Sequence, residues 1–353
     1  MKKALKSILV FLNSLAVFAL ILSYSSVYIP PDYFWIPSLF GLAYPIILAI
    51  NLLFILFWLL FKPRYILLSL IFILLGWGFL VRYFQFKEKT SDTTDIKVLS
   101  YNVRHFLGNG TEKRKENADK IIAFLEEQDA DIICLQEARL RKNSIFNLPA
   151  TVKSLETIKH YQFARSSTTY GSVTMTRYPI INMEEIRFEN SRNITICTDV
   201  LIGKDTVRIF NVHLQSYQID PDRYSIFDSP GIDEEEDLKE VREMGSKFRN
   251  AFQLRAEQVR EIRKHIDESP YHVIVCGDFN DTPASFSYKK LNDGLKDAFV
   301  CSGKGIGRTY IGKLPSFRID YIFHSQKFQS YNFETLDFEL SDHLPIKCDL
   351  VIK

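Results

Sequence analysis

The sequence predicts two parts, a helical membrane segment and a following domain that mixes strands with helices. Three apolar stretches without a charged residue fill most of the first part, at 8–28, 34–61 and 65–81. After residue 95, short runs rich in Val and Ile alternate with two amphipathic helical patterns, without a sequence repeat. Many short strands interspersed with a few helices predict an α+β or layered α/β sandwich for the second part.

The three apolar stretches are predicted to be transmembrane α-helices. About twenty apolar residues cross the hydrocarbon core of a bilayer, so the first two stretches are long enough. The third is shorter and needs Arg64 and Arg82 at its ends, whose side chains extend toward the interface. A cleaved signal peptide is an alternative for the first stretch because lysines precede it. The two further stretches favour a retained, multi-pass anchor.

The positive charges predict how the anchor is oriented. Lysines precede the first span, and Lys62 and Arg64 lie between the second and third spans, so both regions are expected in the cytoplasm. The loop at 30–32 carries no cation. Three spans then place the rest of the chain on the extracytoplasmic side, and the lipid bilayer is the predicted partner of the anchor.

Charge is divided unequally between the two parts. Residues 1–89 contain eight Lys or Arg and two acidic residues, so the remainder carries −4 when the whole chain carries +2. Proteins that follow duplex DNA electrostatically usually show a basic stripe instead. The five cysteines are an odd number, and most lie in apolar runs, so they do not predict a disulfide framework.

The second domain is predicted at 96–353, after a three-span anchor at 1–85 and a charged linker at 86–95. Apolar residues at helical spacing predict helices at 113–127 and 251–266. Strands are predicted for the apolar runs at 96–101, 131–135, 172–176, 194–201, 207–212, 272–276, 319–323 and 346–351.

The stretch 219–248 interrupts this pattern. It contains Pro221, Pro230 and a run of five consecutive acidic residues. Such a composition predicts a solvated surface insertion. A lid or a substrate-selecting loop is the alternative, because the stretch begins just after His213.

Polar side chains stand at the ends of the predicted strands, where a rigid scaffold would present an active site. Asp278 and Asn280 lie two residues apart after an apolar run, so in an extended chain they face the same way. Similar endings supply Asn102, Glu137, His213, Asp320 and the adjacent pair Asp342 and His343. Each residue alone is more often a cap or an ion pair. Together they predict a metal-assisted phosphoester hydrolase, which must hold Mg²⁺, position phosphate oxygens and move a proton.

Seven short stretches of the second domain resemble the motifs of one family. In chain order they are SYNV at 100–103, LQE at 135–137, YGS at 170–172, NVHL at 211–214, GDFN at 277–280, RIDYI at 318–322 and SDH at 341–343. They resemble the endonuclease/exonuclease/phosphatase superfamily, metal-dependent phosphoesterases similar to DNase I, in the order of that family. The resemblance implies a two-sheet β-sandwich flanked by helices, with the active site at one edge.

The resemblance also implies a metal site. Glu137 resembles the principal Mg²⁺ ligand of the family, and Asn102 and Asp342 are expected near the same ion, directly or through water. Mg²⁺ keeps several waters and takes one or two carboxylates. Mn²⁺ is the alternative ion.

Five further residues are expected to carry the catalytic step. His343 resembles the family's catalytic histidine, with Asp320 on its other ring nitrogen, and acts either as a base or as a stabiliser of phosphate charge. Asp278 is expected to orient or deprotonate the attacking water, and Asn280 to donate to a phosphate oxygen. His213 resembles a residue near the scissile phosphate in nuclease members, where it would protonate the leaving oxygen or stabilise charge.

Three residues are weaker candidates for phosphate or substrate contacts, namely Arg104, Tyr170 and Arg308. Surface ion pairing is the more common role of such arginines. The remaining five histidines have no assigned role.

These observations predict a membrane-anchored, Mg²⁺-dependent hydrolase that cleaves a phosphodiester or phosphomonoester by in-line attack of activated water. Lipid head groups, nucleic acid and small phosphoesters are the candidate substrates, and the three spans favour the lipid. A membrane-tethered DNA or RNA nuclease is the alternative, and a catalytically dead scaffold or binding protein is a third hypothesis that the complete motif set disfavours. No obligate protein partner is inferred.

Overall fold

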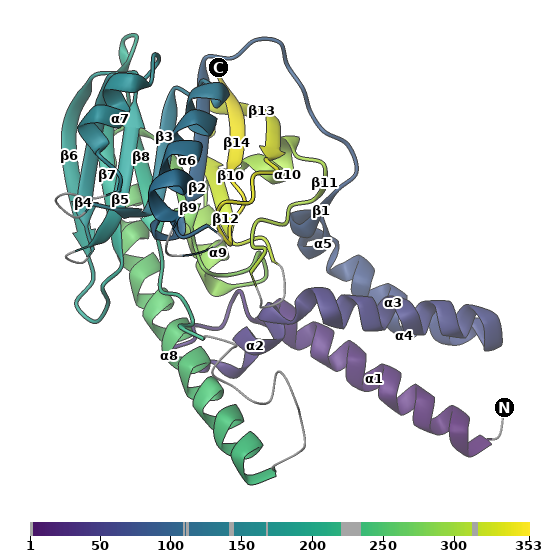
Figure 1. The fold of residues 1–353 in the computed structure, drawn as a ribbon. Coiled ribbons are helices and arrows are strands. Elements are labelled where there is room, and N and C mark those ends of the chain that lie inside the picture. The colour runs from purple at the N-terminus through teal and green to yellow at the C-terminus, as the bar shows by residue number, and fades with distance from the viewer. Residues whose placement is uncertain are drawn as a thin grey trace.

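The computed structural model describes residues 3–108, 110, 113–140, 145–166, 169–219, 234–312 and 317–353. It has two parts, a group of N-terminal helices and a sandwich of two sheets with helices on its outer faces (Figure 1). The helices of the first part extend away from one end of the sandwich, and the chain then runs back along the sandwich to its first strand.

The sandwich consists of two six-stranded sheets. The first has the order β13-β14-β2-β3-β5-β4, with bounds Phe328–Thr335, Ile346–Ile352, Ile96–Asn102, Ile132–Arg139, Tyr170–Thr176 and His160–Arg165. The second has the order β10-β12-β9-β8-β7-β6, with bounds Lys296–Asp297, Asp320–His324, His272–Asp278, Asp205–His213, Ile194–Ile202 and Ile180–Arg187. One pair in each sheet is parallel, β2 with β3 and β8 with β9, and the other neighbours are antiparallel.

The central strands are buried on both faces. Along β2, Ile96 and Val98 belong to the core between the sheets, whereas Leu99 and Tyr101 belong to the core beneath the outer helices. Strands β3 and β9 alternate in the same way. Because both faces of these strands are covered, their sequences are almost continuously apolar. The two-sheet sandwich expected from the sequence is confirmed.

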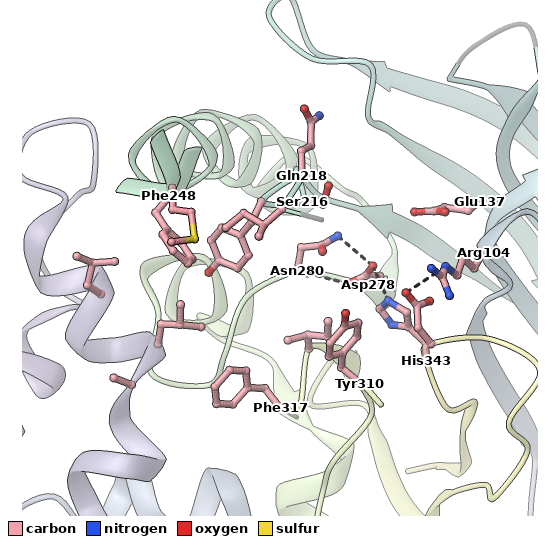
Figure 2. Close-up of a pocket in the computed structure, with 18 of the residues that line it drawn as sticks. Arg104, Glu137, Ser216, Gln218, Phe248, Asp278, Asn280, Tyr310, Phe317 and His343 are labelled. Carbon is pink, nitrogen blue, oxygen red and sulfur yellow. Dashed lines mark hydrogen bonds and ion pairs between the residues drawn. The ribbon is translucent and has the colours of Figure 1, made fainter. Parts of the chain in front are cut away.

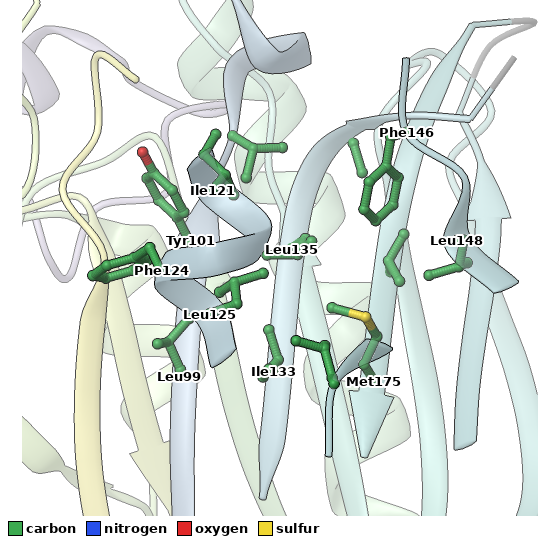
Figure 3. Close-up of a cluster of buried hydrophobic side chains, with 14 of the residues drawn as sticks. Leu99, Tyr101, Ile121, Phe124, Leu125, Ile133, Leu135, Phe146, Leu148 and Met175 are labelled. Atoms are coloured by element: carbon green, nitrogen blue, oxygen red, sulfur yellow. The ribbon is translucent and has the colours of Figure 1, made fainter. Parts of the chain in front are cut away.

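Helices cover the outer faces of both sheets. Helices α6 (Arg114–Gln128) and α7 (Leu148–Ser154) cover the first sheet, and Figure 3 shows Ile121, Phe124 and Leu125 of α6 over the side chains of β2 and β3. Helices α8 (Glu234–Asp267) and α9 (Phe286–Asn292) cover the second sheet. The short elements are η2 (Arg104–Phe106), α10 (Ala298–Ser302) and the pair β1 (Phe84–Gln85) with β11 (Gly305–Ile306).

Helix α8 begins earlier than the sequence pattern predicts. The predicted helix starts at residue 251, whereas the chain is already helical from Glu234, inside the predicted insertion at 219–248. The two prolines and Asp233, the first residue of the acidic run, lie at 220–233, outside the described residues. The described half of the insertion is therefore a helix, which continues as the part of α8 that packs on the outer face of the second sheet.

The N-terminal part contains α1 (Lys3–Ser25), α2 (Ile36–Leu42), α3 (Tyr44–Phe61), η1 (Pro63–Tyr65), α4 (Ile66–Leu75) and α5 (Trp77–Tyr83). Among the described residues, α1 and α3 are each long and apolar enough to cross a membrane. The third predicted span is bent, because η1–α4 and α5 meet at an angle of 69°, a geometry shared by broken spans and re-entrant loops. The break lies at Gly76, where an added Cβ would stand 2.0 Å from the Tyr24 ring.

The N-terminal helices are bonded to the segment that follows β9. Ser26 Oγ donates to the carbonyl of Ala284 at 2.7 Å, and the backbone N–H of Ala284 donates to the Tyr83 hydroxyl at 3.2 Å. Thr282 Oγ1 donates to the carbonyl of Gly41 at 3.3 Å. The end of α1, the end of α2 and the end of α5 thus all meet the sandwich within a few residues of Asp278.

Candidate active site

The polar residues predicted from strand ends meet at one edge of the sandwich. Asn102 ends β2 level with Gln136 of β3, and His213 ends β8 level with Asp278 of β9. Strand β12 runs antiparallel to β9 and begins at Asp320, opposite Asp278. Since the parallel pairs of both sheets end at this edge, residues far apart in the sequence are brought together there.

A cavity of about 630 Å³ opens at this edge. Five of the eight predicted site residues line it, namely Glu137, Asp278, Asn280, Asp342 and His343. The other three, Asn102, His213 and Asp320, are buried and contact the lining residues. Figure 2 shows Glu137, Arg104 and His343 on one side of the cavity, with Asp278 and Asn280 at its centre.

His343 and Asp320 form a buried hydrogen-bonded pair. Nδ1 of His343 lies 2.9 Å from Oδ2 of Asp320, and its Nε2 lies 3.7 Å from Oδ2 of Asp278. Burial opposes the charged imidazole, but the two carboxylates outweigh it and raise the pKa of His343 to about 10. His343 is therefore a cation at neutral pH, with its second N–H directed toward Asp278.

Asp278 lies at the centre of a hydrogen-bond network. It accepts from the side-chain amides of Asn102 at 2.9 Å and Asn280 at 3.0 Å, and from the backbone N–H of Asn280 at 2.7 Å. Burial raises the pKa of Asp278 to about 7, against the opposing effect of the His343 charge. The amide of Asn280 also donates to the carbonyl of Leu214 at 3.0 Å. A phosphate oxygen would have to compete with these two acceptors for Asn280.

Glu137 projects from an irregularity in β3. The register of β3 with β5 shifts between Leu135 and Ala138, and Glu137 has φ +53°. Its carboxylate lies 3.2 Å from Nε2 of His105 and 3.4 Å from Nε2 of His213. The bulge thus turns the Glu137 side chain out of the ladder and into the cavity.

His213 is a neutral imidazole with an unsatisfied nitrogen. Burial, reinforced by the charge of His343, lowers the pKa of His213 to about 4. Its Nε2 has no hydrogen-bond partner within the described part of the chain, although Glu137 and Asp278 lie 3.4 and 3.9 Å away. A buried polar atom without a partner is uncommon in folded proteins, so this nitrogen remains able to bond to a ligand, an ion or a water.

Arg104 and Ser341 connect Asp342 to Asn102 at the cavity wall. Nε of Arg104 lies 3.3 Å from Oδ2 of Asp342, and the backbone N–H of Arg104 donates to Oδ1 of Asn102 at 3.0 Å. Ser341 Oγ donates to the carbonyl of Asn102 at 2.7 Å. The loop before β14 is thereby tied to the end of β2.

Backbone strain is concentrated around the cavity. Five of the eight described non-glycine residues with positive φ line it, namely Arg104, His105, Glu137, Gln218 and Asn280. Each such conformation costs on the order of 1 kcal/mol or more and persists when the surroundings enforce it. Strain collected at one cavity is typical of a functional site.

The donors at the cavity fit a hard divalent cation. Glu137 and Asp342 offer partly exposed carboxylates, with side-chain exposures of 22% and 20%, and the buried Oδ1 of Asn102 accepts the backbone N–H of Arg104. Oxygen donors of this kind suit Mg²⁺. Among the described residues, Asp278, Asp320 and His343 also have ligand atoms within 4.8 Å of one another. That group is buried and its imidazole Nδ1 is engaged by Asp320, so it is the poorer match for Mg²⁺.

Sequence reasoning missed part of the site. His105, which had no assigned role, contacts Glu137, and its ring lies 4.4 Å from that of Tyr170. Tyr310, also unassigned, packs edge-on against His343 with 5.4 Å between ring centroids. Arg308, a weaker candidate, is exposed and does not line the cavity. The positive φ values that direct Arg104 and His105 toward the site leave no signal in the sequence.

Comparison with solved structures finds the same fold in several proteins. An endonuclease/exonuclease/phosphatase from Beutenbergia cavernae DSM 12333 matches with a TM-score of 0.54 and 18% identity, over 74% of this chain and 72% of that one. The mannosyl-6-phosphatase of Bacteroides thetaiotaomicron VPI-5482 matches with a TM-score of 0.51 and 17% identity, over 73% and 100% of the two chains. The catalytic domain of human Nocturnin, solved with a bound sulfate anion, matches with a TM-score of 0.51 and 16% identity, over 74% and 97%.

Family models cover both parts of the chain. Residues 6–83 match a domain of unknown function. Residues 99–343 match the endonuclease/exonuclease/phosphatase family, and this region includes most of the sandwich and the charged residues of the cavity. The search of the curated proteins found no match. The chain therefore belongs to the endonuclease/exonuclease/phosphatase family of metal-dependent phosphoester hydrolases.

Proposed function

We propose that this protein is a membrane-anchored, Mg²⁺-dependent hydrolase that cleaves a phosphodiester or phosphomonoester by in-line attack of water. The observation that carries the proposal is the convergence of carboxylates, amides and imidazoles from six separate segments on one cavity. In-line attack on phosphate requires mainly positioning and charge neutralisation, which such a set of groups supplies.

The pKa shifts divide the acid and base roles between two neighbours. Asp278, with a pKa raised to about 7, is the base that accepts a proton from the attacking water. His343, with a pKa raised to about 10, stays protonated and stabilises negative charge on the phosphate. Groups whose environments push their pKa values apart commonly take such complementary roles.

The remaining residues position these two groups and the phosphate. Asp320 fixes the ring orientation of His343 through Nδ1. Asn102 and Asn280 orient Asp278. His213, neutral and without a hydrogen-bond partner at Nε2 in the described chain, is placed to donate to or accept from a phosphate oxygen.

We propose Glu137, Asn102 and Asp342 as the residues that hold the metal. When bound, a divalent ion supplies positive charge to the phosphate oxygens. Both Glu137 and Asp342 contact a positively charged or hydrogen-bond-donating side chain in the structure, His105 and Arg104. Neighbouring side chains thus already compensate part of the negative charge of these two carboxylates.

We propose the domain division 1–85, 86–95 and 96–353, with the catalytic domain on the extracytoplasmic side. Support comes from the direction of the helices, since the end of α1 and the end of α5 contact the sandwich, whereas the α3–η1 connection lies at the far end (Figure 1). The far connection carries Lys62 and Arg64, as expected for a cytoplasmic loop.

The test uses the full chain in nanodiscs, as wild type and as His343→Ala. Both are incubated with DNA, phospholipid vesicles and 4-nitrophenyl phosphoesters, each with Mg²⁺ or with EDTA, and product release is followed. Cleavage by the wild type that requires both Mg²⁺ and His343 is the expected result. A folded wild type that releases no product from any of them would overturn the proposal, and cleavage of DNA alone would identify a tethered nuclease.

A further inference from the structure

The cavity has a second side that the proposed chemistry does not use. Opposite the charged residues, it is lined by Leu39, Leu42, Ala43 and Ile46 of the N-terminal helices, and by Met244 and Phe248 of α8. Figure 2 shows Phe248 and Phe317 on the side that faces the N-terminal helices, across the cavity from Glu137 and His343. One cavity therefore combines charged groups, which can bind a phosphate, with an apolar wall, which can bind only an apolar part of a substrate.

The apolar wall continues along the membrane-spanning helix α3. Ile46 lines the cavity and is also 53% exposed. Ile50 and Leu53 follow at intervals of four and three residues, which places them on the same helix face, and both are exposed. An exposed apolar stripe thus leads from the cavity down the surface that a bilayer would cover.

The first half of α8 shows the same character. Leu238 and Val241 are exposed, and with Met244 and Phe248 they form a series spaced three or four residues apart. This part of α8 extends past the sandwich beside α2 (Figure 1). The cavity therefore opens between two apolar surfaces that both face away from the sandwich.

Close contacts hold the N-terminal helices, which form part of the apolar wall, in place relative to the catalytic residues. The carbonyl of Gly41 accepts the Thr282 hydroxyl, and a Cβ at Gly41 would lie 2.2 Å from the carbonyl of Ala284. Arg260 of α8 pairs with Asp32 at 2.7 Å. The anchor thus forms a permanent part of the cavity wall, and a tether alone would not need such close contact.

We propose that the apolar side of the cavity binds the hydrocarbon chain of a membrane lipid whose phosphoester lies at His343 and Asp278. The inference rests on the proposed function and specifies its substrate class, an amphiphile with one long apolar chain. Such a chain gains free energy for each methylene that leaves water or displaces it from the cavity. The stripe on α3 gives the chain a path from the bilayer, so the lipid does not have to leave the membrane completely.

The binding test uses the full-length protein in nanodiscs and a dodecyl phosphate that carries a diazirine at its chain end. After irradiation in EDTA, labelled peptides are identified by mass spectrometry. The expected result is labelling of 39–46 and 244–248 that an excess of unlabelled dodecyl phosphate suppresses. Dodecanol with the same diazirine labels the lipid-facing residues of the spans without preference for these segments.

Matched variants separate the cavity wall from the general membrane surface. Leu42→Gln is expected to lower the labelling of 244–248 about tenfold. Phe248→Ala, on the other side of the cavity, gives a second variant that leaves the anchor intact. The control Leu59→Gln changes an exposed residue of α3 that lies outside the stripe of Ile46, Ile50 and Leu53, and leaves labelling unchanged.

Equal labelling of all lipid-facing residues by the phosphate and the alcohol would overturn the inference, and so would equal effects of Leu42→Gln and Leu59→Gln. Hydrolysis of a water-soluble 4-nitrophenyl phosphoester is measured in parallel. If the wild type hydrolyses none of the phosphoesters but is still labelled specifically, the proposed function is overturned and the site for the hydrocarbon chain is retained. If the wild type hydrolyses the phosphoester without specific labelling, only the proposed site for the hydrocarbon chain is overturned.

Discussion

The charged side of the cavity comes from strand ends of the sandwich, whereas its apolar side comes from the N-terminal helices and α8. The charged side is held by short hydrogen bonds such as that between His343 and Asp320, with strained backbone at Glu137 and Asn280. The apolar side is held by helix docking, in which Gly41 and Ala284 approach closely. If the charged side supplies reactivity and the apolar side supplies affinity, as proposed, mutations in the two sides should affect different kinetic constants.

The largest effect is expected on the charged side. His343→Ala should lower kcat by about 10³-fold or more, because it removes a preorganised positive charge at the phosphate. Steady-state kinetics with the best substrate of the phosphoester panel measures it, and thermal unfolding of the variant checks that it is folded. A variant with wild-type kcat would show that the charged side does not carry the chemistry.

A second large effect distinguishes the two groups of metal donors. Glu137→Gln should raise the Mg²⁺ concentration for half-maximal activity at least tenfold, because a carboxylate is a far better ligand for Mg²⁺ than an amide. A Mg²⁺ titration of activity gives the value, with Glu185→Gln on the exposed part of β6 as the control. An unchanged Mg²⁺ requirement would instead favour the buried group of Asp278, Asp320 and His343.

The pH dependence tests the assignment of base and cation. Activity should rise with pH as Asp278 loses its proton near pH 7, and fall as His343 loses its proton near pH 10. Asp320→Asn removes a carboxylate that raises the pKa of His343, so the high-pH limb should move to lower pH. The profile of kcat/KM from pH 5 to 11 measures both limbs, and an unmoved high-pH limb would contradict the role of Asp320.

The smallest effect is expected where the two regions are joined. Gly41→Ala forces a Cβ against the carbonyl of Ala284 and should cost about 1–3 kcal/mol of stability, as in other overpacked sites. The matched change Gly78→Ala meets no neighbouring atom within 4 Å and should be neutral or slightly stabilising in helix α5. Thermal unfolding in nanodiscs compares them, and equal melting temperatures would mean that the anchor is not docked through Gly41.

The sequence predicted the interior of the sandwich better than its margins. All eight predicted strands are present, and they include the central strands β2, β3, β8 and β9. Within the two six-stranded sheets, the four strands that were not predicted, β4, β6, β10 and β13, are the edge strands. The two-residue strands β1 and β11, which pair with each other, were not predicted either. An edge strand pairs on one side only and is partly exposed, so its sequence lacks the continuous apolar run of a central strand.

The charged side of the cavity was predicted from residue types and strand ends. Its apolar side was not predicted. Glu137, Asp278 and His343 could be recognised because the chemistry needs those groups after those strands. The wall formed by Leu42 and Ile46 depends on how the anchor docks, which periodicity does not encode, and the same sequence pattern is satisfied by contact with lipid alone. The break at Gly76 depends likewise on a tertiary contact, that with Tyr24.

The most direct test of the division between the two sides compares two soluble diesters with the full-length protein in nanodiscs. Methyl 4-nitrophenyl phosphate and hexyl 4-nitrophenyl phosphate share the reacting group and differ only in the chain. The account predicts Mg²⁺-dependent release of nitrophenolate from both, with a similar kcat and a KM at least tenfold lower for the hexyl ester. Equal kcat/KM for the two esters would contradict it.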